Sequence, residues 1–266
     1  MPKMTGERPV QEATPDSVLA LHSAGYREVE ARIGTGLVLD LGCGLGFESV
    51  RLIGPDRRVI GIDYDHSAAI SATQRFGNRG FRVMQMDCSR LGIKSHSVDW
   101  VSSSHLIEHF YQPAGHVAEI ARIMKYDGTG FILTPNRPSD FENPFHVVLF
   151  DRDELYSLLN EHFEEVWVGG LDTTQRVKDE IAQRRAKASK VYALDKFGLR
   201  HKMPRSWWIW AYTRLLPLGQ KVIYRSGIGG LTGITDEEFF TSETTDESTP
   251  VLFAVFSKPK IRKVEY

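Results

Sequence analysis

The stretch Val38-Leu39-Asp40-Leu41-Gly42-Cys43-Gly44-Leu45-Gly46 decides the fold of this chain. The apolar run over residues 37–41 predicts a buried strand, and three glycines at every second position follow it directly. Glycine lets the backbone turn tightly and come close to a ligand, because it has no Cβ atom. A glycine-rich turn that leaves a buried strand and enters a helix is typical of ligand-binding α/β folds.

Strands and helices alternate along the chain on both sides of this turn. We expect helices over residues 16–33, 48–53, 67–76, 113–124 and 151–162. We expect strands over residues 37–41, 58–63, 81–86, 98–102, 129–134, 165–168 and 250–257. Strands that alternate with helices at this interval predict a mostly parallel sheet that is covered by helices on both faces.

The alternation stops after residue 170. Residues 176–205 contain ten Lys or Arg and three Asp or Glu, and Trp207, Trp208 and Trp210 follow them. Residues 236–247 contain six acids and no base. We interpret residues 171–240 as an insertion that sits on the sheet domain before its last strand.

Length and composition exclude several classes of protein. The 266 residues suit one large domain, and 33 Lys+Arg balance 34 Asp+Glu to a net charge of −1. Proteins that coat nucleic acid usually carry a basic excess, so we do not expect a nucleic-acid partner. The two cysteines form neither a disulfide framework nor a Cys-x-x-Cys zinc motif. Without a signal peptide or an apolar run of about 20 residues, the chain is expected to be cytoplasmic, with no transmembrane segment.

Three acids lie at the ends of successive predicted strands. Asp63 ends the second strand, 23 residues after Asp40, and Asp87 follows the third. The carboxyl ends of parallel strands form one edge, which is where such sheets bind ligands. A dinucleotide fingerprint of the form G-x-G-x-x-G would need glycine where Phe47 stands. An acid just before the glycines fits a cationic ligand better than a pyrophosphate.

Several further stretches carry a family resemblance. They are residues 61–63, 86–88, 98–101, 105–109, 119–125 and 131–136, besides residues 38–46. With them the chain resembles class I S-adenosylmethionine (SAM)-dependent methyltransferases, in the subgroup with ubiquinone-biosynthesis-like signatures (type 11). The resemblance implies SAM as the cofactor and an α/β, Rossmann-like sheet of seven mostly parallel strands with strand 7 antiparallel. One departure is Lys125-Tyr126-Asp127-Gly128, where members usually have a Pro-Gly turn.

The resemblance also divides the chain and assigns its cofactor-binding residues. We expect a tail and cofactor-covering helix (1–35), a SAM-binding core (36–170), a helical insertion for the acceptor (171–240) and the last strand (241–266). The methionine end of SAM would be lined by Asp40, Gly42, Cys43, Gly44 and Gly46. The ribose would be held by Asp63, and the adenine would meet Tyr64, Asp87 and Cys88. The sulfonium side would be closed by Ser104 and His105, with His22 and Tyr26 as candidates from the first helix.

Methyl transfer to a hydroxyl benefits from a general base, and histidine is the usual one. Among His105, Glu108, His109 and His146, our first choice is His146, in the loop after the fifth strand where acceptors enter this family. His109 is the second catalytic candidate, although packing below the methionine is an alternative role. His105 and His109 would share a face of one helical turn. They do not form a His-Glu-x-x-His motif, and we predict no metal.

Residues 171–240 should decide the acceptor, since the rest of the chain serves SAM. The segment fits a lid that stacks aromatics on sugar rings, a helix that meets anionic lipid through Trp207–Trp210, or a simple helical cap. Residues 194–200 and 204–205 resemble the insertion of glycan-modifying members. We therefore predict O-methylation of a sugar or lipid-linked saccharide. The alternatives are a quinone or other small metabolite as acceptor, and a catalytically silent scaffold protein.

Overall fold

The computed structural model describes residues 14–140, 143–192 and 232–260, and six single residues between 202 and 214. Its centre is an eight-stranded sheet with the order β3-β2-β1-β4-β5-β8-β6-β7. The strands are β1 (Gly36–Leu41), β2 (Arg57–Asp63), β3 (Arg82–Gln85), β4 (Val98–Ser104), β5 (Met124–Pro135), β6 (Phe163–Thr173), β7 (Phe239–Ser242) and β8 (Val251–Pro259). The helices are α1 (Asp16–Glu30), α2 (His66–Phe76), α3 (Pro113–Ile123), α4 (Arg152–Asn160) and α5 (Gln175–Tyr192).

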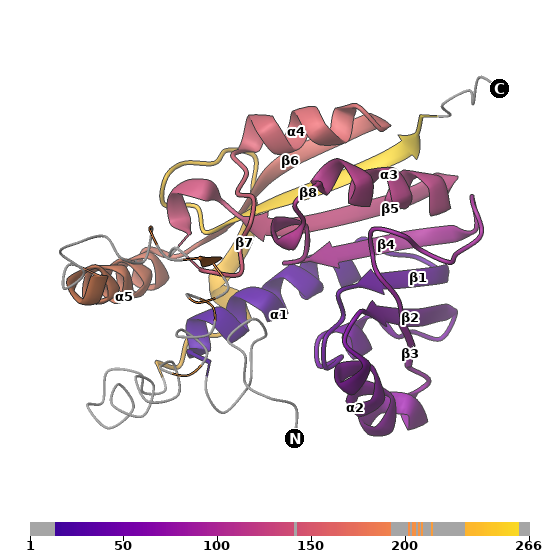
Figure 1. The fold of residues 1–266 in the computed structure, drawn as a ribbon, viewed down its shortest axis with the longest axis horizontal. Coiled ribbons are helices and arrows are strands. Elements are labelled where there is room, and N and C mark those ends of the chain that lie inside the picture. The colour runs from indigo at the N-terminus through magenta and orange to yellow at the C-terminus, as the bar shows by residue number, and fades with distance from the viewer. Residues whose placement is uncertain are drawn as a thin grey trace.

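Helices cover both faces of the sheet (Figure 1), and each face has its own apolar core. Under α3 and α4, side chains such as Ile120 and Leu159 pack on one face. On the other face Ala24 and Val29 of α1 pack against Phe131 and Phe253. The predicted α/β class with two covered faces is confirmed, and it leaves the carboxyl ends of β1, β2 and β4 free to carry a site.

The sheet is parallel from β3 to β5 and antiparallel beyond it. The last strand, β8, lies between β5 and β6 and runs antiparallel to both. The predicted number of seven strands was wrong, because β7 adds an eighth by pairing antiparallel with residues 170–173. This strand has only four residues and follows an acidic stretch, so its sequence carries little strand signal.

One predicted helix is shorter than expected. Residues 48–53 form only a 3₁₀ turn, η1 (Ser49–Leu52), because Gly54 and Pro55 end it at once. By contrast α4 begins with a capping box, in which the side chain of Asp151 accepts from the backbone N–H of Glu154 and the Glu154 side chain reaches back. Local chain chemistry therefore determines where these elements begin and end.

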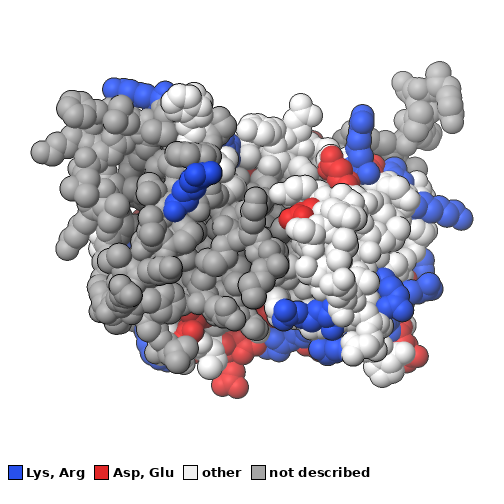
Figure 2. Space-filling view, turned by 60° about the horizontal axis from the view of Figure 1, so that its bottom comes forward, with Lys and Arg blue, Asp and Glu red and all other residues white. Residues whose placement is uncertain are grey.

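The surface and the helices carry two further observations. On the face shown in Figure 2, basic and acidic side chains of the described residues are interspersed rather than gathered into a patch of one sign. In the described part of the chain, no helix is both long and apolar enough to cross a membrane.

The packing of β8 predicts a large effect of truncation there. Phe253 is fully buried, stacks on Phe131 at 6.3 Å between ring centroids and meets Trp167 edge-on. Phe253→Ala should lower the free energy of unfolding by about 3–5 kcal/mol, because it removes a buried ring and leaves a cavity. Phe240→Ala, at the 46% exposed ring on β7, is the matched control and should cost less than about 1 kcal/mol. Equal losses in urea unfolding would contradict this account of the core.

Candidate active site

The turn after β1 is shaped by its glycines and held by β2. Gly42, Gly44 and Gly46 have φ values of +75°, +53° and +76°, which are backbone angles that residues other than glycine adopt rarely. The amides of Gly42 and Cys43 donate to the carbonyl of Ile62, at 2.7 and 3.1 Å. At Gly46 a Cβ atom would lie only 2.7 Å from the ring of Phe81. The glycines therefore allow the left-handed turn, and at Gly46 the absence of a Cβ atom also lets the chain pass close to Phe81.

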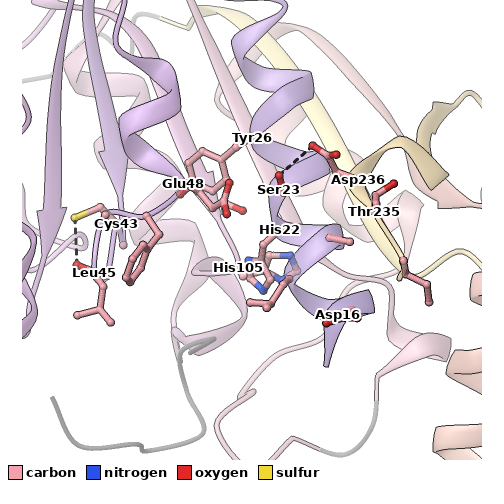
Figure 3. Close-up of a pocket in the computed structure, with 18 residues that line it drawn as sticks. Asp16, His22, Ser23, Tyr26, Cys43, Leu45, Glu48, His105, Thr235 and Asp236 are labelled. Atoms are coloured by element: carbon pink, nitrogen blue, oxygen red, sulfur yellow. Dashed lines mark hydrogen bonds between the residues drawn. The ribbon is translucent and has the colours of Figure 1, made fainter. Parts of the chain in front are cut away.

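A cavity of about 380 Å³ lies beside this turn (Figure 3). Its walls come from α1, from the turn after β1, from the end of β4 and from the segment that leads into β7. The volume is within the range of small-molecule sites. The lining residues are Asp16, Leu19, Ala20, His22, Ser23, Tyr26, Gly42, Cys43, Gly44, Leu45, Gly46, Phe47, Glu48, Ser104, His105, Ile234, Thr235 and Asp236.

The cavity has an acidic environment. Asp40 is fully buried behind it and accepts hydrogen bonds from the hydroxyls of Tyr26, at 3.0 Å, and Ser49, at 2.5 Å. Burial raises the pKa of Asp40 to about 6, and it also raises the pKa of Glu48 in the cavity wall. A cation in the cavity would compensate these carboxylates, which is the chemistry that the sequence predicts for the ligand.

The predicted ribose- and adenine-binding residues lie at the ends of β2 and β3 and do not line this cavity. The buried carboxylate of Asp63 accepts from the backbone N–H of Gly44 at 2.8 Å, and Tyr64 beside it is 60% exposed. The carboxylate of Asp87 accepts from the amide and hydroxyl of Ser89. Cys88 is buried, which raises the pKa of its thiol to about 12. These residues stay predicted cofactor contacts.

Two predicted residues at the end of β4 carry polar atoms without a partner. Ser104 Oγ and His105 Nε2 are both buried, and neither has a hydrogen-bond partner among the described residues. Both residues line the cavity. The ring of His105 faces the ring of His22 from α1, with 4.3 Å between the centroids. A bound ligand with polar groups can satisfy these atoms, whose desolvation otherwise costs free energy.

Glu108 lies behind His105 and has no exposed surface. Its Oε2 accepts from the hydroxyl of Thr134 at 3.1 Å, and its Oε1 lies 3.5 Å from Nδ1 of His105. Burial alone would raise the pKa of Glu108, but His105 first, then His109 and His146, outweigh burial and bring the pKa to about 2. Sequence reasoning considered Glu108 as one of four candidates for the general base and did not pair it with His105, although its spacing of three residues from His105 was a usable signal.

The predicted catalytic pair, His146 and His109, lies outside the lining of the cavity. His146 Nδ1 is 2.7 Å from the carboxylate of Asp140, and its Nε2 is 3.0 Å from the amide nitrogen of Asn143. His109 Nδ1 is 3.0 Å from the carbonyl of Phe145, and the two imidazole rings are 5.3 Å apart. Both histidines remain predicted catalytic residues whose rings are already anchored.

The expected pairing of His105 with His109 on one helical turn was wrong. Residues 107–109 form only a 3₁₀ turn, η3 (Ile107–His109), so the two rings diverge, one to His22 and the other to His146. Glu108, His109 and His146 instead each place one potential ligand atom within 4.8 Å of the others. Their donors are partly committed, because Thr134 and Asn143 already contact Glu108 and His146.

Sequence reasoning missed the cavity wall made by residues 234–236, near the end of the predicted insertion. Asp236 Oδ2 accepts from Ser23 Oγ at 3.0 Å and lies 3.3 Å from Arg51 Nη1, while the guanidinium of Arg27 donates to the Asp236 carbonyl. Thr232 and Gly233 donate their backbone N–H groups to Asp16. These contacts join parts of the chain that are about two hundred residues apart, so no local pattern signals them.

Comparison with known proteins identifies the family. A family model described as a methyltransferase domain matches residues 39–132. A Mycobacterium tuberculosis protein named as a probable S-adenosylmethionine-dependent methyltransferase is 32% identical over 188 residues, 68% of this chain and 68% of that protein. The chain is a class I SAM-dependent methyltransferase. A Burkholderia vietnamiensis ubiquinone biosynthesis O-methyltransferase is 30% identical over 116 residues, 42% of the chain and 50% of that enzyme.

Solved structures show the same fold. A SAM-dependent methyltransferase from Thermotoga maritima superposes with a TM-score of 0.57 at 16% identity, covering 91% of each chain. The cofactor of the present chain is SAM. The residues of the site fit this cofactor, because acids surround the cavity and Ser104 and His105 present polar atoms without a partner among the described residues. When bound, SAM supplies an electrophilic methyl group.

The buried carboxylate of Asp40 predicts a trade between stability and cofactor binding. Its pKa is about 6 in the folded protein against an ordinary value of 3.8, so the native state binds the proton more tightly than the unfolded chain. Stability therefore falls as pH rises from about 4 to 6. Asp40→Asn should be more stable than wild type at pH 8 by about 1–3 kcal/mol, and it should bind SAM more weakly. Thermal unfolding at pH 5 and 8, with calorimetry, measures both; a variant less stable at pH 8 would refute the account.

A second prediction concerns Asp63. Asp63→Ala removes a carboxylate that is predicted to bind the ribose and that also accepts from Gly44. SAM affinity should fall by about 1–3 kcal/mol, which is the usual loss for hydrogen bonds to a charged group. Asp127→Ala, at an exposed acid on β5, is the control and should leave calorimetric affinity unchanged. Equal affinities for wild type and Asp63→Ala would remove Asp63 from the cofactor site.

Proposed function

We propose that this methyltransferase methylates a hydroxyl group of a saccharide, free or lipid-linked. The observation that carries the proposal is the pairing of histidines with carboxylates, His105 with Glu108 and His146 with Asp140. A hydroxyl keeps its proton at neutral pH, so its methylation needs a base, and a carboxylate-held imidazole is a common one. An amine acceptor that is already deprotonated would not need this arrangement.

Exposed aromatic side chains support a saccharide as the acceptor. Tyr111 is 77% exposed and Trp207, from the inserted segment, is 68% exposed. Arg205, also from the inserted segment, lies over the Tyr111 ring at 5.8 Å from its centroid and donates to the Pro144 carbonyl at 2.9 and 3.1 Å. Aromatic rings with a polar neighbour offer both the flat apolar surface and the hydrogen bonds that a sugar ring uses. The inserted segment thus touches the loop that carries His146.

The rival acceptors have their own support. The relative named as a ubiquinone biosynthesis O-methyltransferase favours a quinone-like hydroxyl.

Contact with a membrane through residues 207–210 remains a second part of our proposal; Trp208 and Trp210 lie outside the described residues. The mixed charges on the described part of the face in Figure 2 support our expectation that nucleic acid is not a partner. We also propose a cytoplasmic location for the activity.

An acceptor screen tests the saccharide proposal. Purified enzyme, SAM labelled in its methyl group and a panel of methyl glycosides and short oligosaccharides should give a labelled methyl ether. A catechol and a hydroquinone serve as the rival acceptors. Tyr111→Ala should raise KM for the sugar at least several-fold with kcat nearly unchanged, whereas Tyr156→Ala, an exposed tyrosine on α4, should change neither. Label on the quinol compounds alone would overturn the proposal, and label on no acceptor would favour a binding or scaffold protein.

A further inference from the structure

His105 stands at the point where β4 ends and the cavity begins. Its backbone has a left-handed φ of +51°, and its amide donates to the Leu133 carbonyl of β5 at 2.8 Å. Non-glycine residues adopt this conformation rarely, and such positions persist only where the surroundings hold them. The imidazole ring of His105 lines the cavity. Its Nε2 is buried and has no hydrogen-bond partner among the described residues.

From the side away from Nε2, His105 meets a buried carboxylate. Glu108 Oε1 lies 3.5 Å from His105 Nδ1, just beyond an ordinary hydrogen bond, as catalytic contacts often are before a substrate binds. Glu108 is fixed in place, because its side chain accepts from Thr134 and its backbone carbonyl accepts from the amides of Val147 and Val148. A fixed anion here would hold the proton on Nδ1 and stabilise an imidazolium ring.

We propose that His105 and Glu108 form the general-base dyad of this enzyme, with Nε2 of His105 as the atom that takes the acceptor's proton. The inference rests on the proposed O-methylation. The acceptor oxygen forms a bond to the methyl carbon while the sulfur–methyl bond breaks, and the electron pair of that bond stays on sulfur. The acceptor proton moves to His105 Nε2, and Glu108 keeps its negative charge throughout.

The other titratable groups around His105 do not compete with it for the role of general base. From α1, His22 lies against the ring at a tilt of 45°, and burial, followed by the field of His105, holds the pKa of His22 well below its usual range. It is therefore neutral at pH 7. His109 and His146 also lie near Glu108, since one potential ligand atom of each of the three residues lies within 4.8 Å of the others, and both help to lower its pKa. The remaining titratable groups in the cavity wall are Asp16, Tyr26, Cys43, Glu48 and Asp236.

His146 is less suited to the same task. Both of its ring nitrogens already have partners, Asp140 on Nδ1 and the Asn143 amide on Nε2, and the residue does not line the cavity. In His105, Nδ1 lies beside the carboxylate of Glu108, and Nε2 has no hydrogen-bond partner among the described residues. The arrangement assigns both histidines a structural role: His109 joins η3 to the carbonyl of Phe145, and His146 is held within its own loop by Asp140 and Asn143.

The first test needs no acceptor. Two-bond ¹H–¹⁵N correlation spectra of the histidine rings, assigned with His105→Gln and His22→Gln, report which nitrogen carries the proton. At pH 8, His105 should show a protonated Nδ1 and a bare Nε2, and Glu108→Gln should reduce the preference for this tautomer. A proton on Nε2 in the wild type, or a tautomer insensitive to Glu108→Gln, would overturn the dyad.

The second test is kinetic and uses the methyl glycoside that wild type methylates best. His105→Gln should lower kcat about 10²–10⁴-fold with SAM affinity changed only a few-fold, and added imidazole should restore part of the rate in His105→Gly. Glu108→Gln should lower kcat and move the acid limb of the pH–rate profile to lower pH, because loss of the anion disfavours imidazolium.

Two further variants keep the kinetic result interpretable. His96→Gln is the matched control, because His96 also has a positive φ, +52°, but lies in the turn before β4, outside the cavity lining; its kcat should equal that of wild type. His146→Gln should lose much less activity than His105→Gln. A large loss in His146→Gln with little in His105→Gln would overturn the assignment. If wild type methylates no hydroxyl, the proposed function fails, whereas the tautomer spectra still decide the dyad.

Discussion

The amides of the glycine turn after β1 are tied to the end of β2, and this constraint organises the whole site. Gly42 and Cys43 donate to the Ile62 carbonyl, and Gly44 donates to the carboxylate of Asp63. The chain must therefore leave the sheet between β1 and β2 with its backbone in left-handed conformations. The gap that this exit leaves is covered by α1 on one side and by the end of β4 on the other. The cofactor cavity takes its position from this turn.

The site accumulates negative charge at a cost to the folded protein. Asp40 is fully buried, Glu48 and Asp236 line the cavity, and Glu108 is buried behind His105. A buried carboxylate is destabilising unless it is hydrogen-bonded or compensated by positive charge. Tyr26 and Ser49 compensate part of this at Asp40, and a sulfonium cofactor would compensate more. At Glu108 the compensation comes from histidines, which is also what gives that carboxylate a chemical use.

Much of the fold was readable from the sequence because its signals are local. Alternating apolar runs and the glycines at 42, 44 and 46 predicted the parallel sheet and the ligand-binding edge. The family resemblance then placed Ser104 and His105 at that edge, and both line the cavity. The predicted catalytic role of His146 depended on the loop that it occupies, whereas His109 belongs to the stretch after the fourth strand. The structure places both beside Glu108 rather than in the lining of the cavity.

What could not be predicted depends on contacts between distant segments or on short elements. Asp236 joins the cavity wall through Ser23 and Arg51, and no periodicity in either segment reports that pairing. Strand β7 exists because residues 170–173 offer it an edge. The geometry of His105 follows from one backbone angle at the end of β4, which residue type alone does not reveal.

The central claim is that the methyl group is delivered to the end of β4, beside His105. A ¹³C-filtered NOE experiment on the enzyme with SAM carrying a ¹³C-labelled methyl group tests it most directly. The account predicts cross-peaks from that methyl group to ring protons of His105 and none to those of His146. Cross-peaks to His146 without any to His105 would contradict it and would move the reaction centre to the loop after β5.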